Sequence, residues 1–364
     1  MDDLFDEAAS VEAGRRRGRG ALSNRSGRFE AEARVPMDDG WTREAEGPVR
    51  RELSFDASRR VIARNASPDV PFDRSINPYR GCEHGCVYCF ARPSHAYLGL
   101  SPGLDFETKI LVKPDAAARL ERELGARGYR CAPIAIGTNT DPYQPVERER
   151  RVMRGVLEVL SAWRHPVTIV TKGALVTRDL DLLGEMGRAG LARVSVSLTT
   201  MDSRLSRAME PRAASPEARL RAIAALARAG VPTGAMIAPI VPALTDHEIE
   251  ALMEAAARAG AGWADYVLLR LPGEVRGLFE EWLAEAVPDR AARVMNRVRE
   301  LRGGRENDPR FGSRMRGEGV WADLIRRRFR AAARRLGLTE DWGPLRTDLF
   351  GPPGGRTEQL SLGL

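Results

Sequence analysis

The sequence contains few cysteines, and they are unevenly distributed. Four occur in 364 residues, and three of them, Cys82, Cys86 and Cys89, fall within eight residues of one another. A secreted disulfide framework spreads its cysteines along the chain, so this clustering favours a metal site in a reducing compartment. The sequence also lacks an unbroken run of about 18 apolar residues and an apolar segment of the signal-peptide type near its N-terminus. These absences predict a cytoplasmic protein that makes no contact with a membrane.

Lysine is also scarce. It occurs only as Lys109, Lys113 and Lys172, so arginine carries nearly all of the positive charge. The formal net charge is +7, and within residues 289–336 fifteen arginines outnumber six acidic residues by more than this total. A surface for polyanions is therefore expected in this segment. Two interpretations stay open for it: contact with nucleic acid, or a basic face that only water covers.

The composition divides the chain into four parts. Residues 1–50 lack hydrophobic periodicity and are rich in arginine, glycine and acidic side chains, which predicts a disordered arm or, alternatively, an arm that closes over a substrate. Residues 70–275 alternate short apolar runs with amphipathic stretches and form the expected core domain. Residues 276–340 are predicted as a basic helical extension, and residues 341–364 as a flexible tail rich in proline and glycine.

The core domain alternates predicted strands and helices. Apolar runs predict strands at 134–137, 167–171, 194–198, 235–238 and 266–271, with a sixth around Ile76 and an accessory strand at 109–112. Longer segments predict helices at 115–124, 147–163, 177–189, 216–229 and 246–259. Thr245 and Glu248 are spaced as a capping box for the last helix. The alternation implies right-handed crossovers and a parallel α/β sheet. Six such units favour an incomplete barrel, although spacing alone does not separate it from a doubly wound sheet.

The cysteine cluster lies in residues 77–90, which read Asn-Pro-Tyr-Arg-Gly-Cys-Glu-His-Gly-Cys-Val-Tyr-Cys-Phe. Spacings of three and then two residues bring three thiolates to one point only if the chain wraps around it, and Gly81 and Gly85 permit such a wrap. Thiolates are soft ligands that suit zinc or iron–sulfur clusters rather than magnesium or calcium. A zinc site would take a fourth ligand, for which His84 or His95 is a candidate. An iron–sulfur cluster held by three thiolates would keep one iron open.

This segment resembles the signature of the radical S-adenosylmethionine (SAM) superfamily, which combines the Cys-x3-Cys-x2-Cys spacing with an aromatic residue before the last cysteine, here Tyr88. The resemblance extends over residues 76–271 and implies a partial (β/α)6 barrel of the TIM type. It also implies that Cys82, Cys86 and Cys89 hold a [4Fe–4S] cluster, whose open iron binds SAM and whose electron cleaves SAM to a 5′-deoxyadenosyl radical. Such an enzyme takes its electron from a donor such as flavodoxin or ferredoxin.

More narrowly, the chain is similar to the branch that contains spore photoproduct lyase, a radical SAM enzyme that repairs thymine dimers. In that branch SAM is held by a polar turn after the second strand, a lysine after the third and a serine on the fourth. The resemblance therefore implies that seven residues here bind the cofactors: Tyr88, Asn139, Thr140, Asp141, Lys172, Ser195 and Ser197.

One departure concerns the substrate. The lyase has a cysteine near the end of its second strand that returns a hydrogen atom to the product radical. The corresponding turn here, residues 137–145, contains none, and Cys131 precedes the strand. A substrate other than the thymine dimer is therefore expected. The predicted function is radical SAM chemistry for nucleic-acid repair or modification. The alternatives are a radical SAM enzyme for a protein or small molecule, and a non-catalytic metal-cluster protein that binds nucleic acid.

Three further features lie outside the cysteine segment. The residues from Gln359 to Leu364 resemble the peptide by which bacterial repair proteins bind the sliding clamp, although that peptide normally ends in Phe. Trp321 and the run 326–329 interleave aromatic and basic residues, which suits stacking on single strands or, as we favour for the aromatics, the packing of an amphipathic helix. Glu210 and Arg212 are candidates for a substrate contact or for a solvated ion pair.

Overall fold

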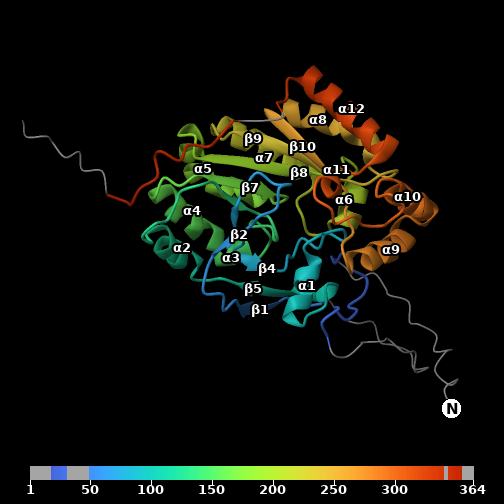
Figure 1. Cartoon of the computed structure of the whole chain (residues 1–364), viewed down its shortest axis with the longest axis horizontal. Coiled ribbons are helices and arrows are strands. Elements are labelled where there is room, and N and C mark those ends of the chain that lie inside the picture. Colours follow the sequence, from blue (N-terminus) through green and yellow to red (C-terminus); the bar gives the residue numbers. More distant parts are fainter. Residues whose placement is uncertain (1–17, 31–48, 340–342, 355–364) are drawn as a thin grey trace, which may run out of the picture.

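The computed structural model describes residues 18–30, 49–339 and 343–354 (Figure 1). Its larger sheet has seven strands, which run from one edge to the other as β10 (Trp263–Leu268), β9 (Thr233–Ile240), β8 (Ala192–Leu198), β7 (Val167–Thr171), β6 (Ile134–Ile136), β3 (Arg74–Ile76) and β2 (Ile62–Arg64). Only β2 is antiparallel to its neighbour, and every other neighbouring pair is parallel.

The order of the parallel strands decides between the two predicted architectures. From β3 to β10 each strand pairs with the next sheet strand along the chain, and the order never reverses. A doubly wound sheet reverses its strand order at a switch point, whereas a partial barrel does not. The prediction of a partial barrel-type α/β fold is confirmed, and all six predicted strand positions are strands.

The helices between these strands cover the sheet and enclose the main core. They are α2 (Ala116–Leu124), α3 (Glu147–Arg150), α4 (Val152–Ala162), α5 (Leu180–Arg188), α6 (Ser203–Met209), α7 (Pro216–Arg228) and α8 (Ile249–Arg258). Short 3-10 helices, η3 (Ala174–Asp179) and η4 (Asp246–Glu248), precede α5 and α8. Alternate residues of the strands, such as Ile169, Val194 and Val196, are fully buried and pack with apolar residues of the helices, such as Leu183 and Ile223.

Two local predictions for these helices were wrong. The helix expected over residues 147–163 is divided, because Arg151 adopts a left-handed conformation with φ of 52° between α3 and α4. The capping box of Thr245 and Glu248 is not formed. Instead, Glu248 accepts hydrogen bonds from the hydroxyl of Thr200 and the amide of Met201, so its carboxylate ties the loop after β8 to α8.

A smaller sheet supports the segment that leads into the cysteines. It contains β1 (Glu52–Phe55), β5 (Lys109–Val112) and β4 (Tyr79–Arg80), and it lies beside α1 (Leu104–Thr108) and the 3-10 turns η1 (Arg92–Ser94) and η2 (Ala96–Leu98) (Figure 1). β5 is the predicted accessory strand. Asp56, just after β1, receives hydrogen bonds from Arg80 at 2.7 Å and is paired with Lys113 at 2.8 Å.

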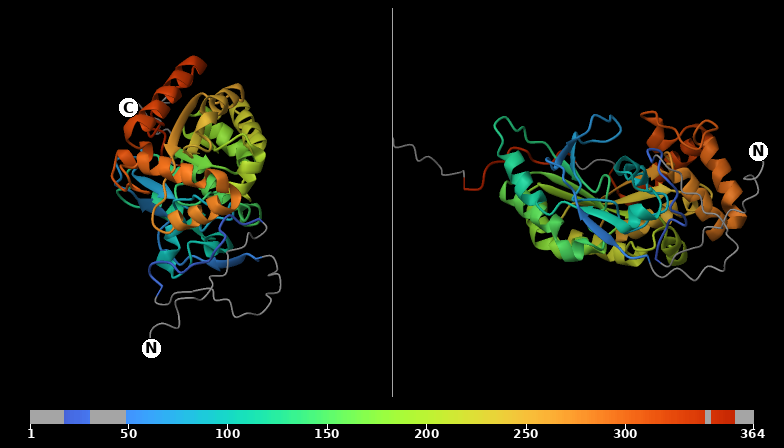
Figure 2. Two further views of the ribbon diagram at one scale, coloured as in Figure 1. Left: turned by 90° about the vertical axis from the view of Figure 1, so that its right-hand side faces the viewer. Right: turned by 90° about the horizontal axis from the view of Figure 1, so that it is seen from below.

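Part of the N-terminal arm differs from its prediction. Residues 18–30 run between α1 and α9 (Val275–Ala286), and Ala21 packs with Leu104 and Leu278 in a small buried cluster (Figure 2). Arg28 is paired with Glu274 of the connection before α9 at 2.8 Å. This part of the arm is therefore packed on the core, because it supplies small and charged side chains that have buried partners. Residues 1–17 and 31–48 of the predicted arm lie outside the described residues.

The C-terminal part continues the same body. It comprises α9, α10 (Pro288–Glu300), α11 (Ser313–Arg316) and α12 (Gly319–Leu336), as the helical extension predicts. α12 packs on α8, with Ile325 and Phe329 buried, so Phe329 has the predicted packing role, whereas Leu324 is 42% exposed. No helix in the described parts of the chain is both long and apolar enough to cross a lipid bilayer.

The predicted tail is partly packed as well. In residues 343–354 the amide of Arg346 donates to the carbonyl of Gly190 at 3.0 Å, and Phe350 lies against Trp163 and His165. This stretch differs from the flexible tail that its glycine and proline content predicts, because one aromatic side chain anchors it. The candidate clamp-binding peptide, Gln359 to Leu364, lies outside the described residues.

Candidate functional site

The cysteine loop follows β4 and is shaped by two glycines. Gly81 and Gly85 have φ angles of 79° and 68°, in the left-handed region. A Cβ on Gly81 would lie 2.9 Å from the carbonyl oxygen of Phe106, so the loop backbone packs directly against the end of α1. The amide of Cys82 donates to the same oxygen at 2.9 Å. The chain therefore turns where the glycines predict it.

The three thiols of this loop lie near one another in the protein interior. Cys82 and Cys86 are buried, Cys89 is half-buried, and none forms a disulfide. Burial raises the pKa of all three thiols, and the charges of Asp141 and of the other two thiolates raise that of Cys82 further. The sulfurs are therefore close enough to repel one another when ionised. A cationic partner would favour their ionised form.

The two histidines proposed as a fourth zinc ligand have other partners. His84 Nδ1 lies 3.3 Å from Asp141 Oδ2, and His95 Nε2 lies 3.0 Å from the carbonyl oxygen of Lys109. Over the whole described part of the chain, no three His, Cys, Asp or Glu side chains are grouped so that they could hold a metal ion. Both histidines thus have polar partners other than the thiols. Three thiolates suit either a zinc ion or an iron–sulfur cluster with one open iron.

Asp141 joins the cysteine loop to the end of β7. Its carboxylate accepts hydrogen bonds from Thr171 Oγ1 at 2.6 Å and from the Lys172 amide at 2.7 Å, in addition to its contact with His84. Burial by itself raises the pKa of Asp141, but the charge and hydrogen bond of His84 and the donors on β7 lower it to about 2. This carboxylate is therefore ionised and fixed in position.

The turn after β6 holds the loop through two more side chains. Thr140 Oγ1 donates to the carbonyl of Gly81 at 2.6 Å, and Gln144 Nε2 donates to the same carbonyl at 3.2 Å. Gln144 Oε1 accepts from the amide of Glu83 at 2.8 Å. The polar turn predicted at the second strand thus lies directly against the cysteine loop.

Lys172 reaches the same region from the end of β7. Its ammonium donates to Thr199 Oγ1 at 3.1 Å and to the carbonyl of Ala238 at 3.0 Å, and it lies 3.1 Å from Glu210 Oε1. It also lies over the ring of Tyr88, 5.7 Å from the ring centroid. Burial, together with a nearby guanidinium, lowers the pKa of Lys172 to about 7. The predicted lysine and the predicted aromatic residue are therefore neighbours.

Comparisons with known proteins agree with this geometry. The family model described as the radical SAM superfamily matches residues 76–256. The chain is 39% identical over 281 residues to an uncharacterized protein of Mycobacterium tuberculosis, across 73% of this chain and 82% of that protein. It is 27% identical over 173 residues to an uncharacterized protein of Methanocaldococcus jannaschii, across 48% of this chain and 62% of that one.

The chain belongs to the radical SAM superfamily.

Solved structures with a similar fold include spore photoproduct lyase. A point mutant of spore photoproduct lyase superposes with a TM-score of 0.56 at 18% identity, over 79% of this chain and 80% of that one. The lyase complexed with a dinucleoside spore photoproduct gives a TM-score of 0.55 at 19% identity, over 80% and 79% of the two chains. At these identities the likeness concerns the fold.

Membership of the radical SAM superfamily implies a [4Fe–4S] cluster and SAM. The donor set of this chain fits the cluster, because Cys82, Cys86 and Cys89 are three unbridged thiols on one loop whose charges interact, and the cluster of this family takes three protein ligands. Cys131 lies elsewhere, before β6, and is half-buried beside Arg74. The remaining cysteine is thus separate from the site, as its position in the sequence predicts.

The other predicted SAM-binding residues differ in their surroundings. Ser195 and Ser197 are both buried and share the face of β8 opposite to Val194 and Val196, which lie in the core beneath the helices. Asn139 is exposed, and its backbone N–H donates to Asn77 Oδ1 at 3.0 Å. Their role in SAM binding stays a prediction.

The sequence analysis did not predict that Glu210 is a central residue of the site. This carboxylate is buried and accepts hydrogen bonds from Tyr88, Thr199 and the buried Arg219, besides its contact with Lys172. It is therefore not a solvated ion pair with Arg212, which instead lies 3.3 Å from Glu83. Nothing in the spacing of Glu210 reveals these contacts, because they join segments far apart in the sequence.

A second buried ion pair behind the loop was also missed. Arg92 and Glu107 are paired at 2.5 Å, and both side chains are inaccessible to solvent. Arg92 Nε donates to the carbonyl of Cys86 at 2.9 Å, while Glu107 accepts from the amides of Gly20 and Ala21 at 3.0 and 2.8 Å. The N-terminal segment thus supports the cysteine loop through one carboxylate.

Proposed function

We propose that this chain cleaves SAM reductively with a [4Fe–4S] cluster held by Cys82, Cys86 and Cys89, and that it uses the resulting radical to repair or modify nucleic acid. The observation that carries the proposal is the buried loop of three thiols at the carboxyl edge of a parallel sheet in a radical SAM chain. When bound, the cluster supplies the electron that splits the sulfonium of SAM.

The chain's own residues would orient SAM and keep the thiols in place. The ammonium of Lys172 is a partner for the methionine carboxylate, because it lies in a half-buried position beside the ring of Tyr88. Thr140 and Asp141 fix the loop, while Asn139 after β6 and Ser195 and Ser197 on β8 supply further polar groups. Replacing Lys172 by methionine should weaken SAM binding about tenfold or more, measured by equilibrium dialysis of reconstituted protein, with Lys109→Met as the control.

The cluster assignment can be tested without knowing the substrate. Anaerobically reconstituted protein should contain about four iron and four sulfide per chain and should release 5′-deoxyadenosine from SAM when reduced by flavodoxin, ferredoxin or dithionite. Cys86→Ala should lose both colour and SAM cleavage, whereas Cys131→Ala should keep both. Stoichiometric zinc without iron, or an equal loss in the two variants, would contradict the assignment.

The substrate class rests on two supporting points. The basic surplus of residues 289–336 is a property of chains that bind polyanions, and the structurally similar lyase is known in complex with a dinucleoside spore photoproduct. The substrate is not expected to be that photoproduct, because the turn after β6 has no cysteine to return a hydrogen atom. Single-stranded or duplex DNA or RNA should raise the rate of 5′-deoxyadenosine release. If none of them raises this rate, the alternative of a protein or small-molecule substrate is favoured over nucleic acid.

A further inference from the structure

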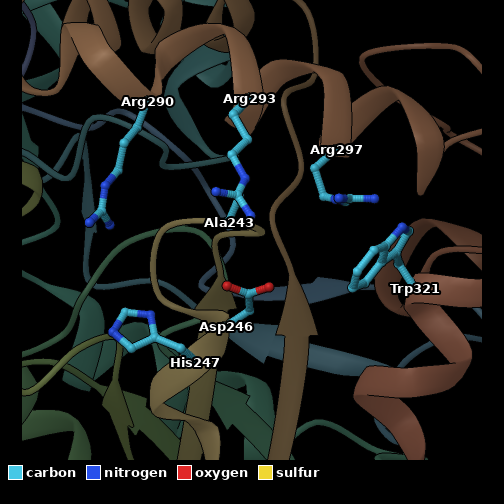
Figure 3. A pocket seen from close by; sticks show the side chains of 7 residues that line it. All are labelled: Ala243, Asp246, His247, Arg290, Arg293, Arg297 and Trp321. Atoms are coloured by element: carbon cyan, nitrogen blue, oxygen red, sulfur yellow. The ribbon is translucent and has the colours of Figure 1, made fainter.

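A cavity beside the site is lined mainly by basic side chains. It has a volume of about 260 Å³ and lies between α10, the loop after β9 and the start of α12 (Figure 3). Its charged and aromatic lining comes from these three elements: Arg290, Arg293, Arg297, Asp246, His247 and Trp321. Figure 3 shows the side chains of Arg290 and Arg293 extending from α10 toward the segment with Ala243 and His247. The side chain of Arg297 points toward Trp321.

Two of these arginines keep their charge available for a ligand. Arg290 and Arg293 are exposed, and neither forms an ion pair within the described residues. Many arginines of the segment 289–336 are neutralised instead, by pairs with neighbouring or distant acids: Arg299 with Glu306, Arg310 with Asp308, Arg316 with Asp265 and Arg328 with Glu250. In the described part of the chain, Arg290 and Arg293 therefore keep unpaired positive charge at the cavity, as Arg327 and Arg334 do on the exposed side of α12.

The third arginine is held by its surroundings. The guanidinium of Arg297 lies 3.7 Å from the centroid of the Trp321 ring, and Glu300 pairs with it from one turn further along α10. Trp321 remains 38% exposed at the rim. With three arginines and one aspartate in the lining, the cavity carries a net positive charge even when His247 is neutral.

The row of arginines is longer than one phosphate. Arg290, Arg293 and Arg297 recur at intervals of three and four residues, so they share one face of α10. At about 1.5 Å of rise per residue the row spans about 10 Å, while phosphates follow one another along a nucleic-acid strand at about 3.4 Å of helix rise. A linear chain of phosphates therefore fits the row better than a single free phosphate.

The neighbouring, buried face of the same helix packs in one apolar cluster with the cysteine loop. Val294, Met295 and Val298 of α10 are buried in one apolar cluster with Cys86 and Tyr88. The loop after β9 makes a second connection, because Ala238 near the end of this strand accepts from Lys172, and Ala243 five residues later lines the cavity. A ligand in the cavity would thus lie along the same rim as the cysteine loop, at the carboxyl ends of the strands.

We propose that Arg290 and Arg293, with Arg297 braced on Trp321, form a binding site for the phosphate backbone of a nucleic-acid substrate. The proposal rests on the proposed function, since it assigns the place where that substrate is held. Phosphate contacts of this kind position a strand without reading its sequence. The site would therefore set the register of the substrate relative to the cysteine loop.

The test compares two charge-matched double variants of the reconstituted full chain. Arg290→Ala with Arg293→Ala removes two arginines from the cavity, and Arg327→Ala with Arg334→Ala removes two exposed arginines from α12 that do not line it. Binding of fluorescent 20-nucleotide DNA and RNA, each single-stranded and duplex, is followed by anisotropy at several salt concentrations. The cavity variant should bind at least about tenfold more weakly and should lower the salt dependence of log K by about 1–2. The α12 variant should stay within about threefold of the wild type.

Each outcome separates this proposal from the proposed function. If the wild type binds DNA and the two double variants weaken it equally, the cavity site is wrong while a nucleic-acid substrate stands. If the wild type binds neither DNA nor RNA, the substrate class itself is wrong, and the cavity assignment falls with it. Displacement of DNA by inorganic phosphate beyond the effect of equal ionic strength of chloride would point to a single-phosphate site and overturn the assignment to a strand. Iron content equal to that of the wild type confirms that the variants are folded.

Discussion

The phenol of Tyr88 donates a hydrogen bond to the carboxylate of Glu210, which lies 122 residues later in the chain. Both side chains are buried, and the same carboxylate is paired with Arg219 and Lys172. One acidic group therefore links the aromatic residue of the cysteine loop to the ends of β7 and β8 and to α7. We expect this link to hold Tyr88, and with it the last two cysteines, in position.

Replacing Glu210 by glutamine should destabilise the protein and loosen the loop. The change leaves Arg219, which is 1% exposed, without its counter-charge, and breaking a buried ion pair in this way costs about 3–5 kcal/mol. Urea unfolding under anaerobic conditions and iron analysis would measure both effects. Glu254→Gln is the matched control, since Glu254 forms an exposed pair with Arg258 on α8. Equal urea midpoints and equal iron contents in the two variants would show that the Tyr88–Glu210 link does not stabilise the cysteine loop.

The packing of the N-terminal segment yields a second prediction. A Cβ on Gly20 would lie 1.8 Å from the carbonyl oxygen of Gly85, which is backbone of the cysteine loop. Gly20→Ala should therefore displace residues 18–22, cost about 1–3 kcal/mol of stability and lower the retention of iron. Gly277→Ala, on α9 where a Cβ meets no atom within 4 Å, should keep iron at the wild-type level and stabilise slightly. Iron loss in the second variant alone would refute the proposed packing.

The parts of this structure that the sequence predicts are those that local spacing governs. Short apolar runs locate the six parallel strands of the larger sheet but not the antiparallel edge strand β2, and the glycine-bordered spacing of Cys82, Cys86 and Cys89 locates the loop. Sequential β–α alternation is also enough to favour a partial barrel. These features depend on residues within a few positions of one another, so they can be predicted from a single sequence.

The contacts that sequence reasoning missed all join distant segments. Glu107 binds Gly20 across 87 positions, and Glu248 binds Thr200 across 48, so no local pattern marks either one. Residues 18–30 have the composition of a disordered arm, yet they pack on the core, because the buried carboxylate of Glu107 accepts hydrogen bonds from their backbone amides. The same applies to Phe350, whose partners lie in other parts of the fold. Tertiary partners override composition in these places.

His165 makes the stability of the tail region depend on pH. This histidine is fully buried beneath Phe350; its Nε2 lies 2.8 Å from the hydroxyl of Tyr129, and its Nδ1 lies 3.0 Å from the carbonyl oxygen of Pro166. The carbonyl can only accept, so Nδ1 carries the proton and Nε2 accepts from the tyrosine. This pattern satisfies the neutral ring, and a proton added at Nε2 would break the hydrogen bond that the tyrosine hydroxyl donates to it.

Burial lowers the pKa of His165 to about 4, whereas in the unfolded chain it is about 6.5. Between these two values the unfolded chain binds more protons, so the free energy of unfolding falls as the pH falls. The difference corresponds to at most about 3 kcal/mol at pH 4, and the effect is absent above pH 7. Because carboxylates also titrate in this range, the informative quantity is the difference between the wild type and His165→Gln, which lacks the imidazole. Urea unfolding at pH 7, 6 and 5 should show the wild type losing stability faster than the variant on acidification; parallel losses would mean that His165 is protonated in the folded state as readily as in the unfolded one.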